Sequence, residues 1–281
     1  MKKKGFTLVE LLVVIAIIAL LLAIIIPSMS KARESAKRVI CSNQFKSVGS
    51  GMVMYAGEYN NIMPYYGGTD SIYYGTCRYS ATPADEAHPY AAYRAVPTTY
   101  TEKCDSTSKP LPMKLACLYA KGIIKDARIF YCPSNVDLVY RYESYTNPPP
   151  WGTLPQEFNK TQSNEWVRIG VTYYPTDPSV KPPTSGTPTG GAPAYSARRW
   201  DGLEAKIPYM SDLLWKKSST SHRVGGSYGL NALFKDGHVV FCTDTKIFTS
   251  DLWDRWSPPN GGTATIDYRY FFFNIFRMIQ P

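Results

Sequence analysis

The chain has 281 residues, of which 44% are hydrophobic and 19% are charged. It is long enough to bury a core, either as one large domain or as two small ones. The formal net charge is +9, and Lys2, Lys3 and Lys4 supply three of the 31 basic side chains. Without these three, 28 Lys and Arg oppose 22 Asp and Glu, a balance of +6. Only a short basic cluster at 31–38 follows, so the charge argues against a specific nucleic-acid partner.

The N-terminal segment is far more apolar than the rest of the chain. Residues 11–26 contain no polar side chain, and residues 6–9 extend the stretch on the other side of Glu10. A helix of about 20 apolar residues crosses a bilayer, whereas the apolar part of a signal peptide has about 7–15. Residues 24–27 also lack the small side chains that signal peptidase requires. We therefore expect a transmembrane helix at 6–26.

Basic residues flank both ends of this helix, so charge alone does not orient it. In segment 4–10, Lys-Gly-Phe-Thr-Leu-Val-Glu, a short basic leader ends at a glycine and the apolar run begins directly afterwards. This segment strongly resembles the type III leader of prepilins and pseudopilins, and the resemblance extends to Pro27. It implies that a prepilin peptidase removes residues 1–5 by cutting between Gly5 and Phe6, and then methylates the new amino group. The N-terminus would face the cytoplasm and the head would be exported.

Glu10 is the one ionisable residue in the apolar stretch. A charged side chain inside a bilayer costs about 2.5–3.5 kcal/mol even on the lenient insertion scale, so it calls for a partner. The resemblance implies that Glu10 pairs with the amino group of Phe6 on a neighbouring subunit and sets the register of assembly. The alternative is a carboxylate that is tolerated near the end of an ordinary membrane anchor.

Residues 27–60 are predicted to continue the helix as an amphipathic segment that packs on the head. The pattern consists of apolar residues at steps of three and four. They are Ala32, Ala36, Val39, Ile40, Val48, Met52, Tyr55 and Tyr59. One helix from residue 6 to about 59 would be roughly 80 Å long. We expect a kink or local melting at Pro27, while Gly49 and Gly51 leave the far end of the helix uncertain.

The remainder, 61–281, is predicted to form a β-rich, loop-rich head. Residues 63–108 are rich in Tyr, Gly, Thr and Pro and predict loops with short strands. Residues 115–121 predict a short helix that ends at Gly122. The stretch 175–193 is dominated by Pro, Thr, Gly and Ser and predicts a flexible surface insertion. The predicted fold class is therefore α+β, with a long hydrophobic N-terminal helix packed on this head.

Residues 231–242 carry the strongest local signal in the head. Two apolar runs flank Asp236 and Gly237, a pair that adopts positive φ at low cost, so we expect a tight β-hairpin. Towards the C-terminus, residues 268–279 are aromatic and apolar and predict a buried closing strand or short helix.

Several segments of the chain resemble large pseudopilin-like exported proteins with a C-terminal processing-associated His…Asp-Gly-His motif. These segments are 41–49, 55–64, 130–134 and 222–239. The motif residues here are His222, Asp236, Gly237 and His238. The spacer between His222 and Asp236 is longer than usual in that group, which puts a direct contact between them in doubt.

The six cysteines favour disulfides in an exported head, although one or more could be buried free thiols. They are Cys41, Cys77, Cys104, Cys117, Cys132 and Cys242. No pair has the C-x-x-C spacing of a zinc ribbon or redox site. Sequence does not assign the pairing. Because Cys41 and Cys132 both flank segments that carry the family resemblance, their disulfide is our first choice.

The sequence offers three weaker functional readings. Residues 225–229 match the nucleophile elbow G-x-S-x-G, but a polar segment precedes them and a predicted strand follows, so a glycine-rich turn is preferred. A metal at His222, Asp236 and His238 is weighed against a hydrogen-bonded structural role, which we prefer, so no metal or cofactor is expected. Finally, Trp200, Trp215, Trp253 and Trp256 could bind glycan, but such residues more often fill a core.

The preferred interpretation is a structural subunit, not an enzyme. It would belong to a type IV pilus-like or type II secretion pseudopilus-like filament, assembled through residues 6–26. Its partners would be copies of itself or related pilins, prepilin peptidase, the inner-membrane assembly machinery and, before assembly, membrane lipid. It would start as a single-pass inner-membrane precursor and end in a periplasmic or extracellular filament. The alternative is a membrane-tethered exported surface or glycan-binding protein that does not polymerise.

Overall fold

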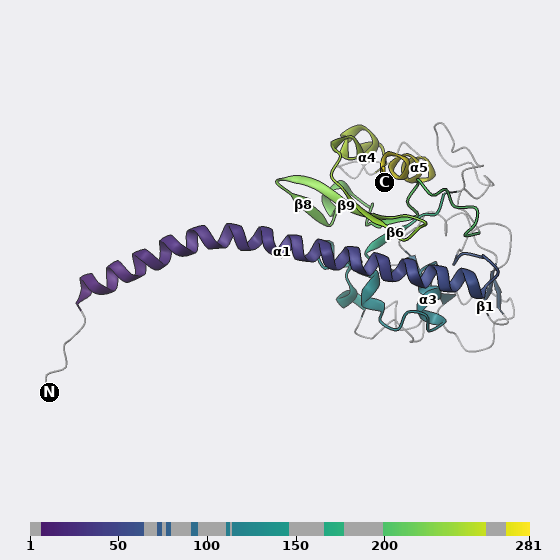
Figure 1. Ribbon diagram of the computed structural model, residues 1–281, viewed down its shortest axis with the longest axis horizontal. Coiled ribbons are helices and arrows are strands. Elements are labelled where there is room, and N and C mark those ends of the chain that lie inside the picture. The colour runs from purple at the N-terminus through teal and green to yellow at the C-terminus, as the bar shows by residue number, and fades with distance from the viewer. Residues whose placement is uncertain are drawn as a thin grey trace.

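The computed structural model consists of a long N-terminal helix and a head packed against its C-terminal half (Figure 1). The described residues are 7–64, 72–74, 77–79, 91–94, 111–112, 114–145, 166–176, 199–256 and 268–281. Gly5 and Phe6 lie outside them, as does most of the predicted insertion at 175–193. The predicted α+β class is confirmed.

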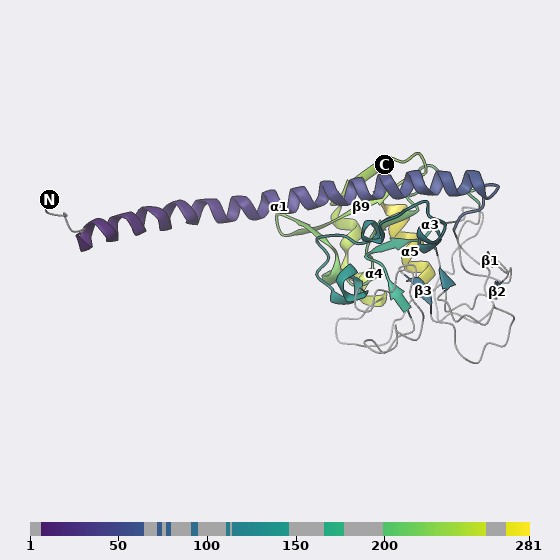
Figure 2. The ribbon, with the colours of Figure 1, turned by 90° about the horizontal axis from the view of Figure 1, so that it is seen from below.

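Helix α1 spans Leu8–Glu58, 51 residues without interruption. At 1.5 Å per residue it is about 77 Å long, and its N-terminal half projects beyond the head (Figure 2). Pro27 lies inside the helix, where its ring removes one backbone hydrogen bond. The local melting expected there is not seen, and the axis curves gently (Figure 1). The helix ends before Asn60 and Asn61, which both adopt positive φ.

The two glycines that made the helix end uncertain lie on the face of α1 that meets the head. A Cβ on Gly49 would lie 3.4 Å from the Leu233 side chain, and one on Gly51 would lie 3.3 Å from Ile124. Each glycine costs about 1 kcal/mol of helix propensity relative to alanine. Their small size lets the head approach the helix closely, and packing against the head maintains the helix through both positions.

The central sheet is antiparallel, with strand order β10-β9-β7-β6, and β8 pairs with β9 outside that path. Its strands are β6 (Val171–Tyr173), β7 (Met210–Asp212), β8 (His222–Val224), β9 (Ser227–Leu233) and β10 (Val239–Cys242). The predicted hairpin is confirmed, with Val239 opposite Leu233 and Gly237 at φ +86. The G-x-S-x-G segment is a second hairpin turn, in which Gly225 and Gly226 adopt positive φ.

The other elements are short. Two further sheets contain β1 (Ile72–Tyr74) with β2 (Cys77–Tyr79), and β4 (Leu111–Pro112) with β3 (Ala91–Arg94) and β5 (Trp166–Arg168). The other described helices are α3 (Ala116–Ala120), η1 (Ala127–Phe130), η2 (Leu138–Tyr140), η3 (Tyr142–Tyr145), η5 (Lys217–Ser219), η6 (Thr245–Phe248), α4 (Ser250–Trp256) and α5 (Tyr268–Met278). The predicted short helix before Gly122 is therefore confirmed, and the closing element is a helix.

The described residues of the head form two cores, one on each side of the central sheet. The first includes Phe45, Met52 and Leu233 and lies between α1 and the sheet. The second includes Phe234, Trp253 and Phe276 and lies between the sheet and helices α4 and α5 (Figure 1). Alternate residues of β9 enter opposite cores, as the pleat of a strand requires.

Candidate functional site

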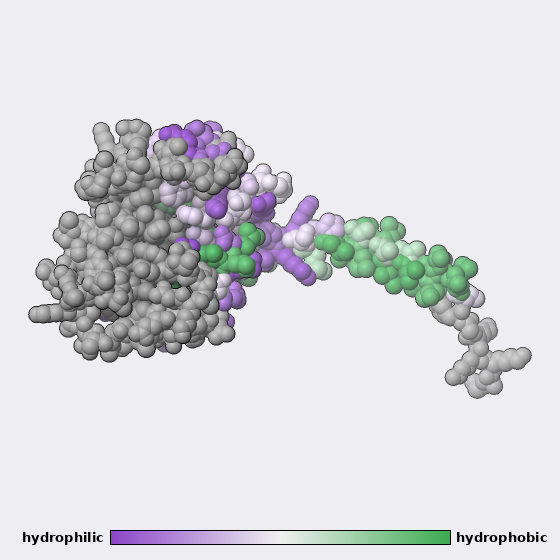
Figure 3. All heavy atoms as spheres, turned by 180° about the vertical axis from the view of Figure 1, so that it is seen from behind, coloured by the Kyte–Doolittle hydropathy of each residue, from purple (hydrophilic) through white to green (hydrophobic). Residues whose placement is uncertain are grey.

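The apolar half of α1 is uncovered. Its Leu, Ile and Val side chains between Leu8 and Ile26 are exposed, and they form the hydrophobic rod in Figure 3. The most apolar 18-residue window of α1 has a mean hydropathy of 3.4, with none of it buried. Within the part of the chain that the structure describes, α1 is the one helix long and apolar enough to cross a membrane.

The rod begins with a capping box. The Thr7 hydroxyl accepts a hydrogen bond from the Glu10 amide, at 3.2 Å, and the Glu10 carboxylate accepts from the Thr7 amide and hydroxyl, each at 2.8 Å. This arrangement satisfies amide groups that the first turn of a helix leaves unpaired. In the isolated chain Glu10 is therefore a capping residue. Its predicted pairing with Phe6 involves a residue outside the described part.

A second site lies where α1 meets the sheet. Leu233 of β9 packs in the core beneath α1, so Asn231 and Gly229, two and four residues earlier, share its face. Asp212 of β7 accepts hydrogen bonds from Asn231, and His222 of β8 pairs across the strands with Gly229. This face of the sheet therefore changes from apolar to polar towards β8.

The helix supplies the opposing groups. Glu34 and Cys41 are seven residues apart, two turns of helix, and so face the same direction. A Glu34 carboxylate oxygen lies 2.6 Å from Nδ1 of His222, and the other accepts a hydrogen bond from the Ser134 hydroxyl at 2.9 Å. Glu34 thus joins α1 to β8 and to the loop that follows η1.

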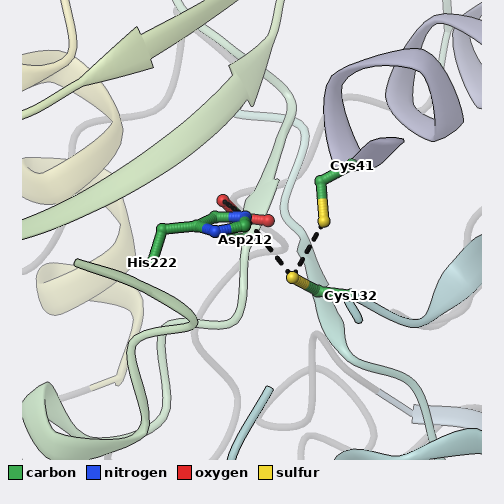
Figure 4. Close-up of side chains that lie close together, drawn as sticks. All are labelled: Cys41, Cys132, Asp212 and His222. Carbon is green, nitrogen blue, oxygen red and sulfur yellow. Dashed lines mark hydrogen bonds and ion pairs between the residues drawn. The ribbon is translucent and has the colours of Figure 1, made fainter. Parts of the chain in front are cut away.

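The same loop carries Cys132. Its Sγ lies 2.9 Å from Sγ of Cys41 and 3.4 Å from Nε2 of His222 (Figure 4). Both sulfurs are thiols here, and the predicted Cys41–Cys132 disulfide stays a prediction. The loop also lies close to Gly170, the residue before β6. A Cβ on Gly170 would come within 3.0 Å of the Tyr140 carbonyl oxygen and 3.1 Å of the Cys132 amide nitrogen.

Asp212 completes the cluster and is fully buried. Its Oδ2 lies 3.6 Å from Nε2 of His222 and accepts from the Asn231 amide and side chain at 2.6 and 3.1 Å. Among the described residues, Asp212 Oδ1 has no hydrogen-bond partner. A buried polar atom without a partner costs about 1–3 kcal/mol, so this oxygen requires an explanation.

The cluster is strongly polarised. Burial lowers the pKa of His222, but its contacts with Cys132, Asp212 and Glu34 outweigh this and raise it to about 9. Burial raises the pKa of Cys132, but the hydrogen bond from Cys41 and the contact with His222 lower it to about 5. Burial, reinforced by the charge on Cys132, raises the pKa of Asp212 to about 7. The hydrogen bond to Cys132, together with burial, raises the pKa of Cys41. The contact between Cys132 and His222 thus lowers the pKa of the thiol and raises the pKa of the imidazole.

Comparison with known proteins assigns two parts of the chain. Residues 1–26 match the family model described as "Prokaryotic N-terminal methylation motif". Residues 30–204, more than half of the chain, match the one described as "Protein of unknown function (DUF1559)". The chain belongs to the DUF1559 family. The family match includes Glu34, Cys41 and Cys132, whereas Asp212 and His222 lie beyond it.

This DUF1559 protein is similar to a curated relative, the ComG operon protein 3 homolog of Bacillus licheniformis. The two are 34% identical over 64 residues, which is 23% of this chain and 66% of the relative. No solved structure matches. The methylation motif, the relative and the long apolar helix support a pilin-like protein. The predicted resemblance at the C-terminal His…Asp-Gly motif lies outside these matches and stays a prediction.

The structure divides the predicted motif of this DUF1559 protein into two places. His222 lies opposite Gly229, near the start of β9, whereas Asp236 and His238 form the turn after the end of that strand. His238 Nδ1 contacts the Asp236 carboxylate, and its ring stacks on Phe234. The structure therefore does not bring together His222, Asp236 and His238, the three residues considered above as possible metal ligands.

Sequence reasoning missed Glu34 and Asp212. Asp212 stands in no recognisable motif, since its role depends on strands that pair only in the fold. Glu34 did carry a signal, because it lies two helical turns before Cys41. Cys41 and Cys132, the residues of the predicted disulfide, do lie side by side, with their sulfurs 2.9 Å apart.

Proposed function

We propose that this chain is a structural subunit of a type IV pilus-like or type II secretion pseudopilus-like filament. The observation that carries this proposal is the uncovered apolar half of α1, which directly follows a methylation motif. A rod of exposed Leu, Ile and Val side chains is incompatible with water. It requires either lipid or the same surface of other subunits around it.

During assembly the apolar half of α1 would move from the bilayer into the filament, and the free energy of this transfer decides which interactions drive assembly. Lipid tails are as apolar as leucine, so moving the rod from lipid into a bundle of similar rods yields little hydrophobic free energy. Close packing and polar pairing must therefore supply the free energy that favours the filament over the lipid. A carboxylate at Glu10 costs about 2.5–3.5 kcal/mol at the centre of a bilayer on the lenient scale. Pairing with the methylated amine of Phe6 on a neighbouring subunit would remove this cost and favour assembly.

The proposal includes location and partners. The precursor would cross the inner membrane once, with a cytoplasmic N-terminus and an exported head, and lipid would surround the rod until assembly. Prepilin peptidase would cut between Gly5 and Phe6, and assembly machinery would then move the subunit into a periplasmic or extracellular filament containing copies of itself or related pilins. The head, 61–281, would decorate its outside.

Two other functions receive less support from the geometry. Cys132 and His222 have the chemistry of a nucleophile and its base, but they are 5% and 0% exposed, so no substrate could reach them. For glycan binding, Trp253 is 1% exposed in the second core and cannot stack on a sugar. Trp200 and Trp215 are partly buried against the first core, and Trp256 is partly buried against the second.

Two measurements test the filament proposal. Surface filaments sheared from the parent cells should contain this protein as seen by mass spectrometry, and its N-terminal peptide should begin at methylated Phe6. Gly5→Val should accumulate uncut precursor, because a β-branched side chain replaces the smallest residue at the cut. A mature chain that starts at Met1 would contradict the processing step. If surface and periplasmic fractions contain the processed protein but no filaments, the membrane-tethered alternative is favoured.

A further inference from the structure

We propose that Cys41, Cys132, Asp212 and His222 form a binding site for a thiophilic divalent cation of the zinc class. One potential ligand atom from each of the four side chains lies within 4.8 Å of all the others, and all four residues are buried. Two thiolates, an imidazole and a carboxylate are a donor set that suits zinc in a four-coordinate structural site. From the sequence we expected no metal, and these four residues come from segments far apart in the chain.

Three distances can be compared with tetrahedral coordination. Zinc bonds of about 2.3 Å to sulfur and about 2.0–2.2 Å to nitrogen and oxygen place ligand nitrogen and sulfur about 3.6 Å apart, and nitrogen and oxygen about 3.4 Å apart. Here Nε2 of His222 lies 3.4 Å from Sγ of Cys132 and 3.6 Å from Oδ2 of Asp212. Both separations fit a shared ion.

The two sulfurs are closer than an ion would hold them. Two zinc-bound sulfurs lie about 3.8 Å apart, whereas the Sγ atoms of Cys41 and Cys132 are 2.9 Å apart. An adjustment of about 0.9 Å would also replace the hydrogen bond between the thiols by two thiolate–metal bonds. Cys41 belongs to α1 and Cys132 to the loop after η1, so binding would reposition the helix and the loop slightly.

The site contains an acceptor that no described protein group satisfies. Asp212 is 0% exposed, and its Oδ1 has no hydrogen-bond partner among the described residues, although Oδ2 has two. A carboxylate in such surroundings costs several kcal/mol unless a cation neutralises it. A divalent ion between Asp212 and the thiolates would supply that charge.

Glu34 is placed to hold the His222 ring in position from the side opposite the proposed ion. Metal-binding histidines commonly donate their second ring N–H to a carboxylate, which fixes the tautomer and directs the other nitrogen at the metal. Nδ1 of His222 lies 2.6 Å from Glu34, so an N–H there leaves Nε2 free to face Cys132 and Asp212 (Figure 4). Glu34 is therefore a positioning residue and not a ligand.

The ligands would join four separate segments, namely α1, the loop after η1, β7 and β8. An ion held by all four would fasten the filament helix to the head at the point where α1 leaves it. This inference does not depend on polymerisation, since it concerns the single subunit. A Cys41–Cys132 disulfide would exclude metal binding, because neither sulfur could then act as a thiolate ligand.

The direct test is the metal content of the full chain, purified in detergent from membranes without reducing agent. We expect about one zinc ion per chain by elemental analysis, and X-ray absorption at the zinc edge should show mixed sulfur and nitrogen or oxygen coordination. Replacement by Co²⁺ should produce sulfur-to-cobalt charge-transfer absorption. These measurements on the unaltered protein do not depend on whether any variant folds.

Matched variants locate the site. Cys132→Ser and His222→Gln should lose the ion, whereas Cys242→Ser and His238→Gln, which replace the same residue types outside the cluster, should retain it. Glu34→Gln should bind Zn²⁺ about 10–100-fold more weakly while keeping the sulfur signal in the Co²⁺ spectrum. Metal-free protein with a Cys41–Cys132 disulfide in non-reducing peptide mapping would overturn the proposal. So would zinc that remains in both Cys132→Ser and His222→Gln.

Discussion

The residues that matter most in this protein derive their roles from neighbours that are distant in sequence. His222 is a polar residue on a short strand, but in the fold it is fully buried between Glu34, Cys132 and Asp212. His238 has the same chemistry and sits in an exposed turn against Asp236. The two histidines therefore serve different purposes, and residue type alone does not distinguish them.

Glu10 has two candidate roles that variants can separate. Glutamine can replace glutamate in a capping box, so Glu10→Gln keeps the cap but removes the charge. Thr7→Val removes the cap but keeps the carboxylate. If Glu10 pairs with a neighbouring amine, Glu10→Gln should reduce filament yield strongly, as Glu10→Ala should, while Thr7→Val stays near the parent.

The measurement is the filament yield from sheared cells at matched membrane abundance of processed protein. All three variants should still be inserted and cut. Normal filaments from Glu10→Gln, together with loss in Thr7→Val and Glu10→Ala, would show that Glu10 acts only as a cap.

At the scale of elements, close approaches of backbone decide where the loop carrying Cys132 can lie. A Cβ on Gly170 would crowd two neighbouring atoms, the Tyr140 carbonyl oxygen and the Cys132 amide nitrogen. Both atoms belong to the backbone, so a rotamer change cannot relieve the contact. The loop and β6 are thus so close that a side chain at Gly170 would force a backbone segment to shift by a few tenths of an ångström.

Gly170→Ala should therefore destabilise the head by about 1–3 kcal/mol, because the loop must shift away from β6. Gly57→Ala is the control, since a Cβ on this helical residue meets no atom within 4 Å. It should be neutral or stabilise the chain by about 0.5–1 kcal/mol, as alanine favours the helix. Thermal unfolding of the full chain in detergent measures both, and equal melting temperatures for the two variants would disprove the role of Gly170.

At the scale of the whole molecule, α1 joins two environments. Its N-terminal half is uncovered, and its C-terminal half contributes Phe45, Val48 and Met52 to the first core. The second core, beneath α4 and α5, has no residue from α1. The contact between helix and head therefore depends on the first core and the cluster at its edge.

If an ion occupies that cluster, chelation should loosen one core and not the other. With EDTA, amide hydrogen exchange should increase in α1 around Cys41 and in β8, while α5 around Phe276 stays as protected as before. The Cys132→Ser chain provides the control, since it should hold no ion and its hydrogen exchange should be the same with and without EDTA. An equal increase in both regions would indicate general unfolding instead of release of the helix.

The sequence alone was sufficient for features that depend on neighbouring residues. The apolar run, the long helix, the short helix before Gly122 and the hairpin at Asp236 and Gly237 were all predicted and are all present. Each follows from periodicity or turn chemistry over a few residues. Gly5 and Phe6 were predicted as the cleavage site from the resemblance of residues 4–10 to a prepilin leader, and the methylation motif match covers both.

Tertiary structure decided the junction of helix and head. His222 lies 188 residues from Glu34 and 90 from Cys132, and Cys132 lies 91 from Cys41. No spacing rule reaches across such intervals, because these neighbours depend on how the faces of α1 and the sheet pack together. The sequence alone determined that a membrane-length helix precedes a β-rich head. Only the fold brought two thiols, an imidazole and a carboxylate to one point beneath that helix.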